Sequence, residues 1–155
     1  MVPLSVAVCL SLLALAGATD VKQCSGRSIA NLKENVQLTP CNRLPCKLKK
    51  GTDQHITITF VPENDVDKVI NKVTAELVPG LPVPFIGVDG NSICDKVSTP
   101  EGDKASCPLR AGTKYVYKDS FPVLSIYPSL DTIVHWALSD GKSDMVCFEV
   151  PVKIK

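Results

Sequence analysis

Residues 55–60 read His-Ile-Thr-Ile-Thr-Phe, a stretch in which apolar and polar side chains alternate strictly. Successive side chains of a β-strand point to opposite faces of a sheet, so the two isoleucines and Phe60 share one face. His55 and the threonines share the other. The pattern predicts a strand with one buried side, which needs a second apolar layer to pack against.

Further short apolar runs lie on both sides of this stretch, at residues 73–77, 114–118, 123–127, 132–138 and 145–154. Residues that favour turns bound each run, and Asp140-Gly141 predicts a tight hairpin because glycine accepts a positive φ. No long segment has the 3.6-residue apolar period of a helix. The chain is therefore predicted to be all-β, with about seven strands in two antiparallel sheets packed face to face as a β-sandwich.

The composition is typical of one globular domain. Of 155 residues, 45% are hydrophobic and 21% are charged. Lysine and arginine total 17 against 16 acidic residues, which gives a formal charge of +1. Proteins that hold nucleic acids need a broad field of positive charge, so no nucleic-acid partner is predicted.

The first 18 residues have the pattern of a secretory signal peptide. Residues 4–16 are all apolar or small, and Ala16-Gly17-Ala18 supplies the small residues that signal peptidase accepts. A membrane-spanning helix needs about 20 apolar residues, so this run is too short to be one. We expect cleavage after Ala18, which leaves residues 19–155 as a single secreted domain.

Removal of residues 1–18 takes away Cys9 and lowers the number of cysteines from seven to six. An even number in an exported chain favours three disulfides. The spacings 41–46 and 94–107 suggest two pairs, but six cysteines allow 15 pairings and the sequence alone does not choose among them. The six are Cys24, Cys41, Cys46, Cys94, Cys107 and Cys147.

The sequence contains no recognisable catalytic or metal-binding motif. A G-x-S-x-G segment and a C-x-x-C pair are both absent. His55 lies on the polar face of its strand, and His135 precedes Trp136 in a mainly apolar run; neither lies near a cysteine cluster in the sequence. We interpret both as ordinary polar positions and predict no enzyme, no metal and no other cofactor.

Three lysines, Lys47, Lys49 and Lys50, follow Cys46 closely. A solvated surface is the simpler interpretation of such a cluster. Contact with an anionic lipid surface is the alternative.

Several short segments resemble a known family in the order in which they occur. They are Thr39-Pro-Cys41, Cys46-Lys-Leu-Lys-Lys-Gly51, Leu81-Pro-Val-Pro-Phe85, Phe121-Pro-Val123, Tyr127-Pro-Ser129, Val134-His-Trp136 and Cys147-Phe-Glu-Val-Pro-Val152. Together they resemble the Niemann-Pick type C2 proteins, which belong to the ML family of secreted lipid-recognition domains. The resemblance extends from Cys24 to Ile154. It implies an immunoglobulin-like sandwich, disulfides Cys24–Cys147, Cys41–Cys46 and Cys94–Cys107, and a lipid cavity between the sheets.

The resemblance also implies a ligand site. It places Phe85, Val123 and Tyr127 at the mouth and wall of the cavity, and Leu38, Trp136 and Phe148 in its depth. Ordinary core packing is the alternative for each of these residues. Two positions depart from the mammalian pattern, since Phe148 replaces a tryptophan and Ile126 replaces an acidic residue, so a different pocket shape is expected.

The implied function is that of a monomeric carrier that binds cholesterol or a related sterol and transfers it without chemistry, through transient contact with a membrane or a membrane receptor. The alternatives are an extracellular carrier of long-chain fatty acids or semiochemicals, and an innate-immune module that captures microbial lipids. The sequence has no N-x-S/T glycosylation site, a feature in which it resembles arthropod relatives. This argues against glycan-directed delivery to the lysosomal lumen and favours an extracellular location.

Overall fold

The computed structural model describes residues 17–26 and 29–155. The expected signal peptide lies outside the described residues apart from Gly17 and Ala18, and so does Cys9. The described part of the chain contains no helix that is long and apolar enough to cross a membrane.

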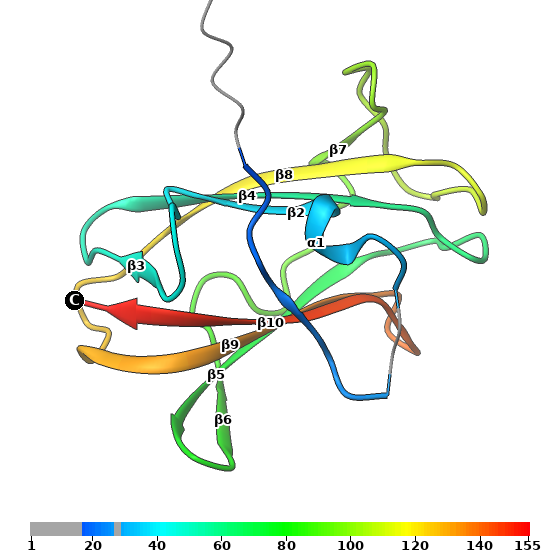
Figure 1. The fold of residues 1–155 in the computed structure, drawn as a ribbon. Helices are drawn as coiled ribbons and strands as arrows, with labels where there is room; N and C mark the ends of the chain where they lie inside the picture. The colour runs from blue at the N-terminus through cyan, green and yellow to red at the C-terminus, as the bar shows by residue number, and fades with distance from the viewer. Residues whose placement is uncertain (1–16, 27–28) are drawn as a thin grey trace, which may run out of the picture.

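The described residues form two sheets that lie one above the other (Figure 1). The larger sheet has the strand order β1-β10-β9-β5-β6, with β3 beside β10, and the smaller has the order β2-β4-β8-β7. The strands are β1 (Lys22–Gln23), β2 (Val36–Thr39), β3 (Cys46–Leu48), β4 (Asp53–Phe60), β5 (Ile70–Val78), β6 (Leu81–Pro84), β7 (Val97–Ser98), β8 (Tyr115–Pro122), β9 (Leu130–Ser139) and β10 (Asp144–Ile154).

The predicted β-sandwich is confirmed. Three of the strands, β1, β3 and β7, have only two or three residues; the other seven have four or more. All strand pairs are antiparallel except β3 and β10, which run parallel with Cys46 opposite Val152. A short helix that the sequence pattern did not predict, α1 (Leu32–Asn35), precedes β2.

The alternation at residues 55–60 determines which side of β4 is buried. Ile56 and Ile58 are at most 1% exposed, whereas His55 on the opposite face is exposed. Phe148 and Val150 of β10 belong to the same continuous core from the other sheet. Each large apolar side chain buried in this way stabilises the fold by about 1.5–3 kcal/mol.

The strand predicted at residues 123–127 is wrong, because this segment is a loop. β8 ends at Pro122, and prolines on both sides of the segment lack the N–H groups that a ladder requires. Two backbone hydrogen bonds connect the loop instead to residues 51 and 52. Gly51 N–H donates to the Val123 carbonyl at 2.7 Å, and Val123 N–H donates to the Thr52 carbonyl at 2.8 Å.

The hairpin predicted at Asp140-Gly141 joins β9 to β10, and Gly141 has a φ of 93°. The Asp140 carboxylate accepts hydrogen bonds from Ser143 N and Lys142 N, both at 2.7 Å. These two bonds lower the pKa of Asp140. The side chain therefore remains an acceptor that fixes the turn.

The structure contains the three expected disulfides, Cys24–Cys147, Cys41–Cys46 and Cys94–Cys107. Cys24–Cys147 joins the end of β1 to β10 across a sequence separation of 123 residues. A loop of that length corresponds to about 4–5 kcal/mol of stabilisation in chain-entropy terms.

Candidate functional site

A narrow apolar space lies between the sheets, and we call it the inner crevice. Its volume is only about 10 Å³. Every residue that lines it is apolar: Leu38, Leu48, Val73, Phe85, Phe121, Val134, Trp136, Val150 and Val152.

A second apolar space, which we call the outer pocket, opens at the edge of the sandwich near the β5–β6 hairpin. Its volume is about 150 Å³. Phe85 lines both spaces and therefore divides them. The other lining residues are Ala75, Leu77, Val83, Pro84, Ile86, Ile126, Tyr127, Pro128, Leu130, Thr132 and Ile154.

A row of aromatic rings runs from the outer pocket through the inner crevice. The ring centroids of Tyr127 and Phe85 are 5.0 Å apart, and those of Phe85 and Phe121 are 5.9 Å apart. Phe121 lies 5.5 Å from Trp136, which stacks on Phe148 at 6.4 Å with nearly parallel planes. Side chains in such a row offer a continuous apolar surface to a ligand that replaces their contacts with one another.

The mouth, by which we mean residues 85–86 and 123–129, is held by a few side-chain hydrogen bonds. The Tyr127 hydroxyl donates to the Ile86 carbonyl at 2.6 Å, and burial raises the pKa of this phenol. Lys50 Nζ donates to Ser129 Oγ at 2.8 Å and to the Tyr127 carbonyl at 3.3 Å. Lys50 is therefore a structural contact of the mouth and not a free member of the lysine cluster.

A buried chain of hydrogen bonds fixes the deep end of the aromatic row, and we call it the floor. Trp136 Nε1 donates to Asn71 Oδ1 at 3.1 Å, and Asn71 Nδ2 donates to the Tyr117 hydroxyl at 2.9 Å. The hydroxyl in turn donates to Asp119 at 2.9 Å. Burial, with a smaller contribution from the Asp119 charge, raises the pKa of Tyr117 well above its usual range. The floor thus connects β5 and β9 of one sheet with β8 of the other.

The structure brings together four of the six residues expected at the site. Leu38, Phe85 and Trp136 line the inner crevice, and Phe85 and Tyr127 line the outer pocket. Val123 and Phe148 are at most 1% exposed but line neither space.

Sequence reasoning missed several lining residues that alternation could have indicated. Val73 and Ala75 share the apolar face of one run, and Val150 and Val152 share a face with Phe148. Phe121 occurs in one of the motifs quoted above, and the structure places it in the middle of the aromatic row.

The expected open cavity is nearly closed in this structure. Ligand pockets usually enclose about 300–1,000 Å³, whereas the inner crevice has about 10 Å³. The aromatic side chains account for the difference, because they fill the space between the sheets. Even together, the inner crevice and the outer pocket fall short of this range, so a ligand of sterol size requires Phe85 and the neighbouring rings to move apart.

Two hollows larger than the outer pocket lie near Phe60, at the end of β4 away from the mouth. One of about 220 Å³ is lined in part by Glu63, Asn64 and Asp140, and one of about 470 Å³ in part by Glu34 and Lys114. Their charged and polar linings do not suit an apolar ligand. Volume alone therefore does not identify the site, and the lining favours the inner crevice and outer pocket.

Among the described residues, only Cys24, His135 and Cys147 form a group of three metal-type ligands. The two sulfurs are joined in a disulfide and so offer no thiolate to a metal. The expectation that His135 lies far from the cysteines is wrong in space, because the β9–β10 pairing places it beside them.

A sequence model for a protein family, described as ML domain, matches residues 18–154. This chain belongs to the ML domain family. The family consists of lipid-binding proteins and not enzymes, so the predicted resemblance and the prediction of no enzymatic activity are confirmed.

Relatives of this ML-domain chain occur in vertebrates and insects. It is 31% identical over 149 residues to the bovine "NPC intracellular cholesterol transporter 2", covering 94% of this chain and 91% of the relative. It is 30% identical over 143 residues to the "Ecdysteroid-regulated 16 kDa protein" of Manduca sexta, covering 92% and 93%.

A solved structure supports the fold of this ML-domain chain. The crystal structure of a Niemann-Pick type C2 protein from the Japanese carpenter ant matches with a TM-score of 0.66 at 23% identity. The match covers 90% of this chain and 96% of the ant protein. At this level of identity, the likeness concerns the fold alone.

Proposed function

We propose that this protein is a carrier that binds cholesterol or a related sterol between its sheets and transfers it unchanged. The observation that carries the proposal is that two apolar spaces, the outer pocket and the inner crevice, lie on either side of Phe85, which lines both. The names of the mammalian relatives, which are cholesterol transporters, support the same ligand class.

The mouth offers a route for opening that leaves the sheets intact. Phe85 and Tyr127 both lie outside the strands, and the Tyr127–Ile86 hydrogen bond and the contact of the two rings link their loops. Breaking the hydrogen bond costs about 0.5–1.5 kcal/mol, far less than the loss of several ladder bonds. Movement of Phe85 would then join the two apolar spaces.

The expected affinity suits a carrier that must also release its ligand. Removal of about 300 Å² of sterol surface from water contributes roughly 7–8 kcal/mol. Immobilisation of the ligand and rearrangement of the rings oppose this gain. The balance favours modest affinity and ready exchange.

The lining favours a neutral ligand over a fatty-acid anion or a phosphorylated microbial lipid. None of the described residues lining either space is charged, and the Tyr127 hydroxyl is already engaged with the Ile86 carbonyl. A carboxylate or phosphate would lose its hydration there without gaining a cationic partner.

Exposed apolar residues surround the outer pocket and would favour transient contact with a membrane or acceptor protein. They are Leu77, Val78, Leu81, Ile86 and Ile126, each at least 47% exposed. We call this group the apolar rim. We further propose that residues 1–18 direct the chain into the secretory pathway and that the mature protein acts as a monomer in an extracellular or luminal fluid.

The test is binding of the fluorescent sterol dehydroergosterol by wild type, Phe85→Trp and Val123→Phe. We expect Phe85→Trp to lose binding at least about tenfold, a loss of about 1.4 kcal/mol, because it adds volume where the two spaces meet. We expect Val123→Phe to weaken binding by displacing the loop that carries Tyr127. Phe60→Trp is the matched control, since Phe60 is equally buried at the far end of β4. Variants that fold and bind like wild type would contradict the proposed site.

A competition experiment separates the alternatives. Unlabelled cholesterol, oleic acid and lipopolysaccharide would each be titrated against bound dehydroergosterol. We expect cholesterol to displace the probe at the lowest concentration. Displacement by oleic acid or lipopolysaccharide at lower concentrations than cholesterol would favour the corresponding alternative function.

A further inference from the structure

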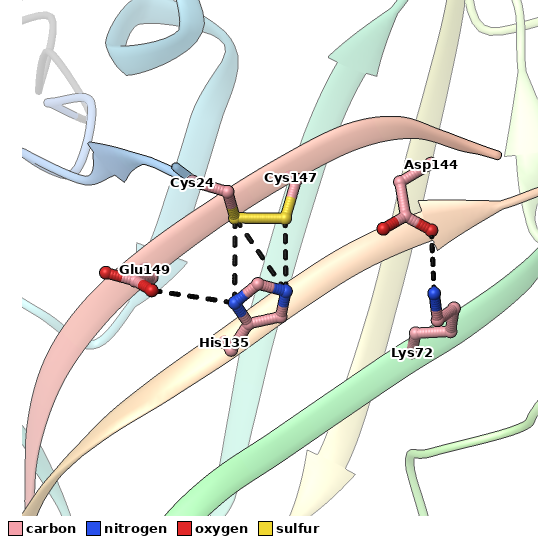
Figure 2. Close-up of a disulfide and its surroundings, with 6 residues drawn as sticks. All are labelled: Cys24, Lys72, His135, Asp144, Cys147 and Glu149. Atoms are coloured by element: carbon pink, nitrogen blue, oxygen red, sulfur yellow. Dashed lines mark hydrogen bonds and ion pairs between the residues drawn. A yellow bond between two sulfur atoms is a disulfide. The ribbon is translucent and has the colours of Figure 1, made fainter. Parts of the chain in front are cut away.

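A histidine lies against a disulfide on the outer face of the larger sheet (Figure 2). His135 Nε2 is 3.2 Å from Cys147 Sγ, and Nδ1 is 3.6 Å from Cys24 Sγ. In the described part of the chain, no histidine lies within hydrogen-bond distance of either other disulfide. The contact is therefore specific to this sulfur pair.

The strand register creates this arrangement. Across the β9–β10 pair, His135 lies opposite Glu149 and Ala137 lies opposite Cys147. Cys24 and Cys147 are at most 6% exposed, whereas the His135 side chain is 41% exposed. The ring can therefore exchange protons with solvent while its inner edge contacts the sulfurs.

We propose that Cys24–Cys147 is a thiol–disulfide exchange site for a dithiol reductant, with His135 as the proton donor to the departing sulfur. Thiol–disulfide exchange proceeds by attack of a thiolate and is faster when the leaving sulfur is stabilised. A proton donor 3.2 Å from Cys147 Sγ is positioned to provide that stabilisation.

In the first step, one thiolate of the reductant attacks Cys24 Sγ and forms a mixed disulfide. The Cys24–Cys147 bond breaks, and its electron pair goes to Cys147 Sγ, which takes the proton from His135 Nε2. The second thiolate of the dithiol then attacks the first dithiol sulfur, which is bonded to Cys24 in the mixed disulfide. Cys24 leaves as a thiolate and takes a proton from solvent. The dithiol loses two electrons and two protons, and the protein gains the same number.

Of the two sulfurs in this disulfide, that of Cys24 is more accessible than that of Cys147 to an attacking thiolate. It follows β1, which pairs with β10 through only Lys22 and Gln23. The Cys24 N–H to Cys147 carbonyl hydrogen bond is long, at 3.4 Å. A short edge strand of this kind opens locally at low cost, which exposes Cys24 while the rest of the sheet remains folded.

The charged groups around His135 come from each neighbouring strand. Glu149 Oε1 lies 3.6 Å from Nδ1 and forms an ion pair with the ring when it is protonated. Lys22 lies opposite Glu149 on β1. On β5, Thr74 lies opposite His135, and Lys72 pairs with Asp144 of β10 at 2.9 Å. Glu149 is thus the carboxylate placed to stabilise the proton-donating form.

The experiment compares reduction of the folded protein by dithiothreitol in wild type and His135→Gln. Acid quenching, alkylation and peptide mass spectrometry give a separate rate for each disulfide. At about pH 6 we expect dithiothreitol to reduce Cys24–Cys147 at least about fivefold more slowly in His135→Gln than in wild type. Imidazoles lose their proton over about pH 5 to 8, so the difference should shrink to within about twofold at pH 9.

The chain offers internal and matched controls. The reduction rates of Cys41–Cys46 and Cys94–Cys107 should be the same in His135→Gln and wild type. In His55→Gln, all three disulfides should be reduced at wild-type rates. Equal rates for wild type and His135→Gln at pH 6, or a difference that does not change with pH, would overturn the proposal. If His135→Gln does not fold, Glu149→Gln decides: a slower rate at pH 6 is expected, and an unchanged rate would overturn the proposal.

Discussion

The two ends of the aromatic row are held in place by very different means. At the mouth, Tyr127 is linked to the Ile86 carbonyl by one hydrogen bond, and Lys50 reaches the same loop from a partly exposed position. At the floor, Trp136, Asn71 and Tyr117 form a buried chain that joins both sheets.

This difference indicates where the sandwich can open. Separation of the sheets at the floor would leave several buried polar groups without partners, at about 1–3 kcal/mol for each. Opening at the mouth breaks exposed or partly buried contacts between loops. We therefore expect the deep end to act as a fixed pivot while the Phe85 end moves.

The largest expected effect is at the floor. Trp136→Ala should lower the free energy of unfolding by about 3–5 kcal/mol, because it removes a large core ring and the donor to Asn71. Urea unfolding measures this loss. Phe85→Ala should cost less, since Phe85 already borders the outer pocket; an equal or larger cost there would remove the distinction between the two ends.

Asn71→Ala tests the polar part of the floor. It leaves Trp136 Nε1 and the Tyr117 hydroxyl without their partner, so we expect a loss of about 1–3 kcal/mol in unfolding free energy. Asn91→Ala is the matched control, because Asn91 donates to the Gly87 carbonyl from an exposed position. Similar losses of unfolding free energy in the two variants would show that the buried hydrogen bonds of the floor contribute no more to stability than an exposed one.

Tyr127→Phe tests the mouth. Loss of the hydrogen bond to Ile86 should lower stability by only about 0.5–1.5 kcal/mol but speed sterol release severalfold, as measured by stopped-flow transfer to liposomes. Tyr115→Phe serves as control, since its hydroxyl accepts a hydrogen bond from Arg110 N away from the site. An unchanged release rate in Tyr127→Phe would mean that this bond does not limit opening.

Alkaline pH should affect the mouth before the floor. Burial raises the pKa of Tyr127 above 10.0, so the folded state favours the neutral phenol. The neutral Tyr127 phenol therefore stabilises the folded state below about pH 10, and this stabilisation is lost as the pH rises through the folded-state pKa of Tyr127. Sterol release should accelerate in that range in wild type but not in Tyr127→Phe, with tyrosinate absorbance recorded in parallel. Acceleration of both proteins alike would assign the effect to another group.

The smallest effect is expected from Lys50→Met. It removes the hydrogen bonds to Ser129 and to the Tyr127 carbonyl from a partly exposed residue, so the stability loss should be below about 1 kcal/mol. A modest rise in release rate is expected from liposome transfer. Lys49→Met, which alters an exposed lysine next to it, should leave both quantities unchanged.

The sequence predicted those parts of the molecule that depend on local patterns. Alternation placed Ile56, Ile58 and Trp136 on buried faces, because the period of a strand is independent of what packs against it. The motifs of the family indicated Phe85 and Tyr127, and both line the outer pocket.

Features that depend on long-range geometry could not be predicted in this way. The contact of His135 with Cys147 arises from strand register, and the Lys50 bond to Ser129 joins residues 79 positions apart. The near closure of the inner crevice depends on ring orientations that no pattern of apolar residues determines.

The edge strand β6 has a consequence for solubility at high concentration. Phe85 N–H donates to the Val73 carbonyl, so alternation directs the amides of Pro82 and Pro84 away from β5. Neither proline has a hydrogen to offer a strand from another molecule. The apolar rim can thus remain exposed without a neighbouring sheet edge on which copies of the protein would stack into fibrils.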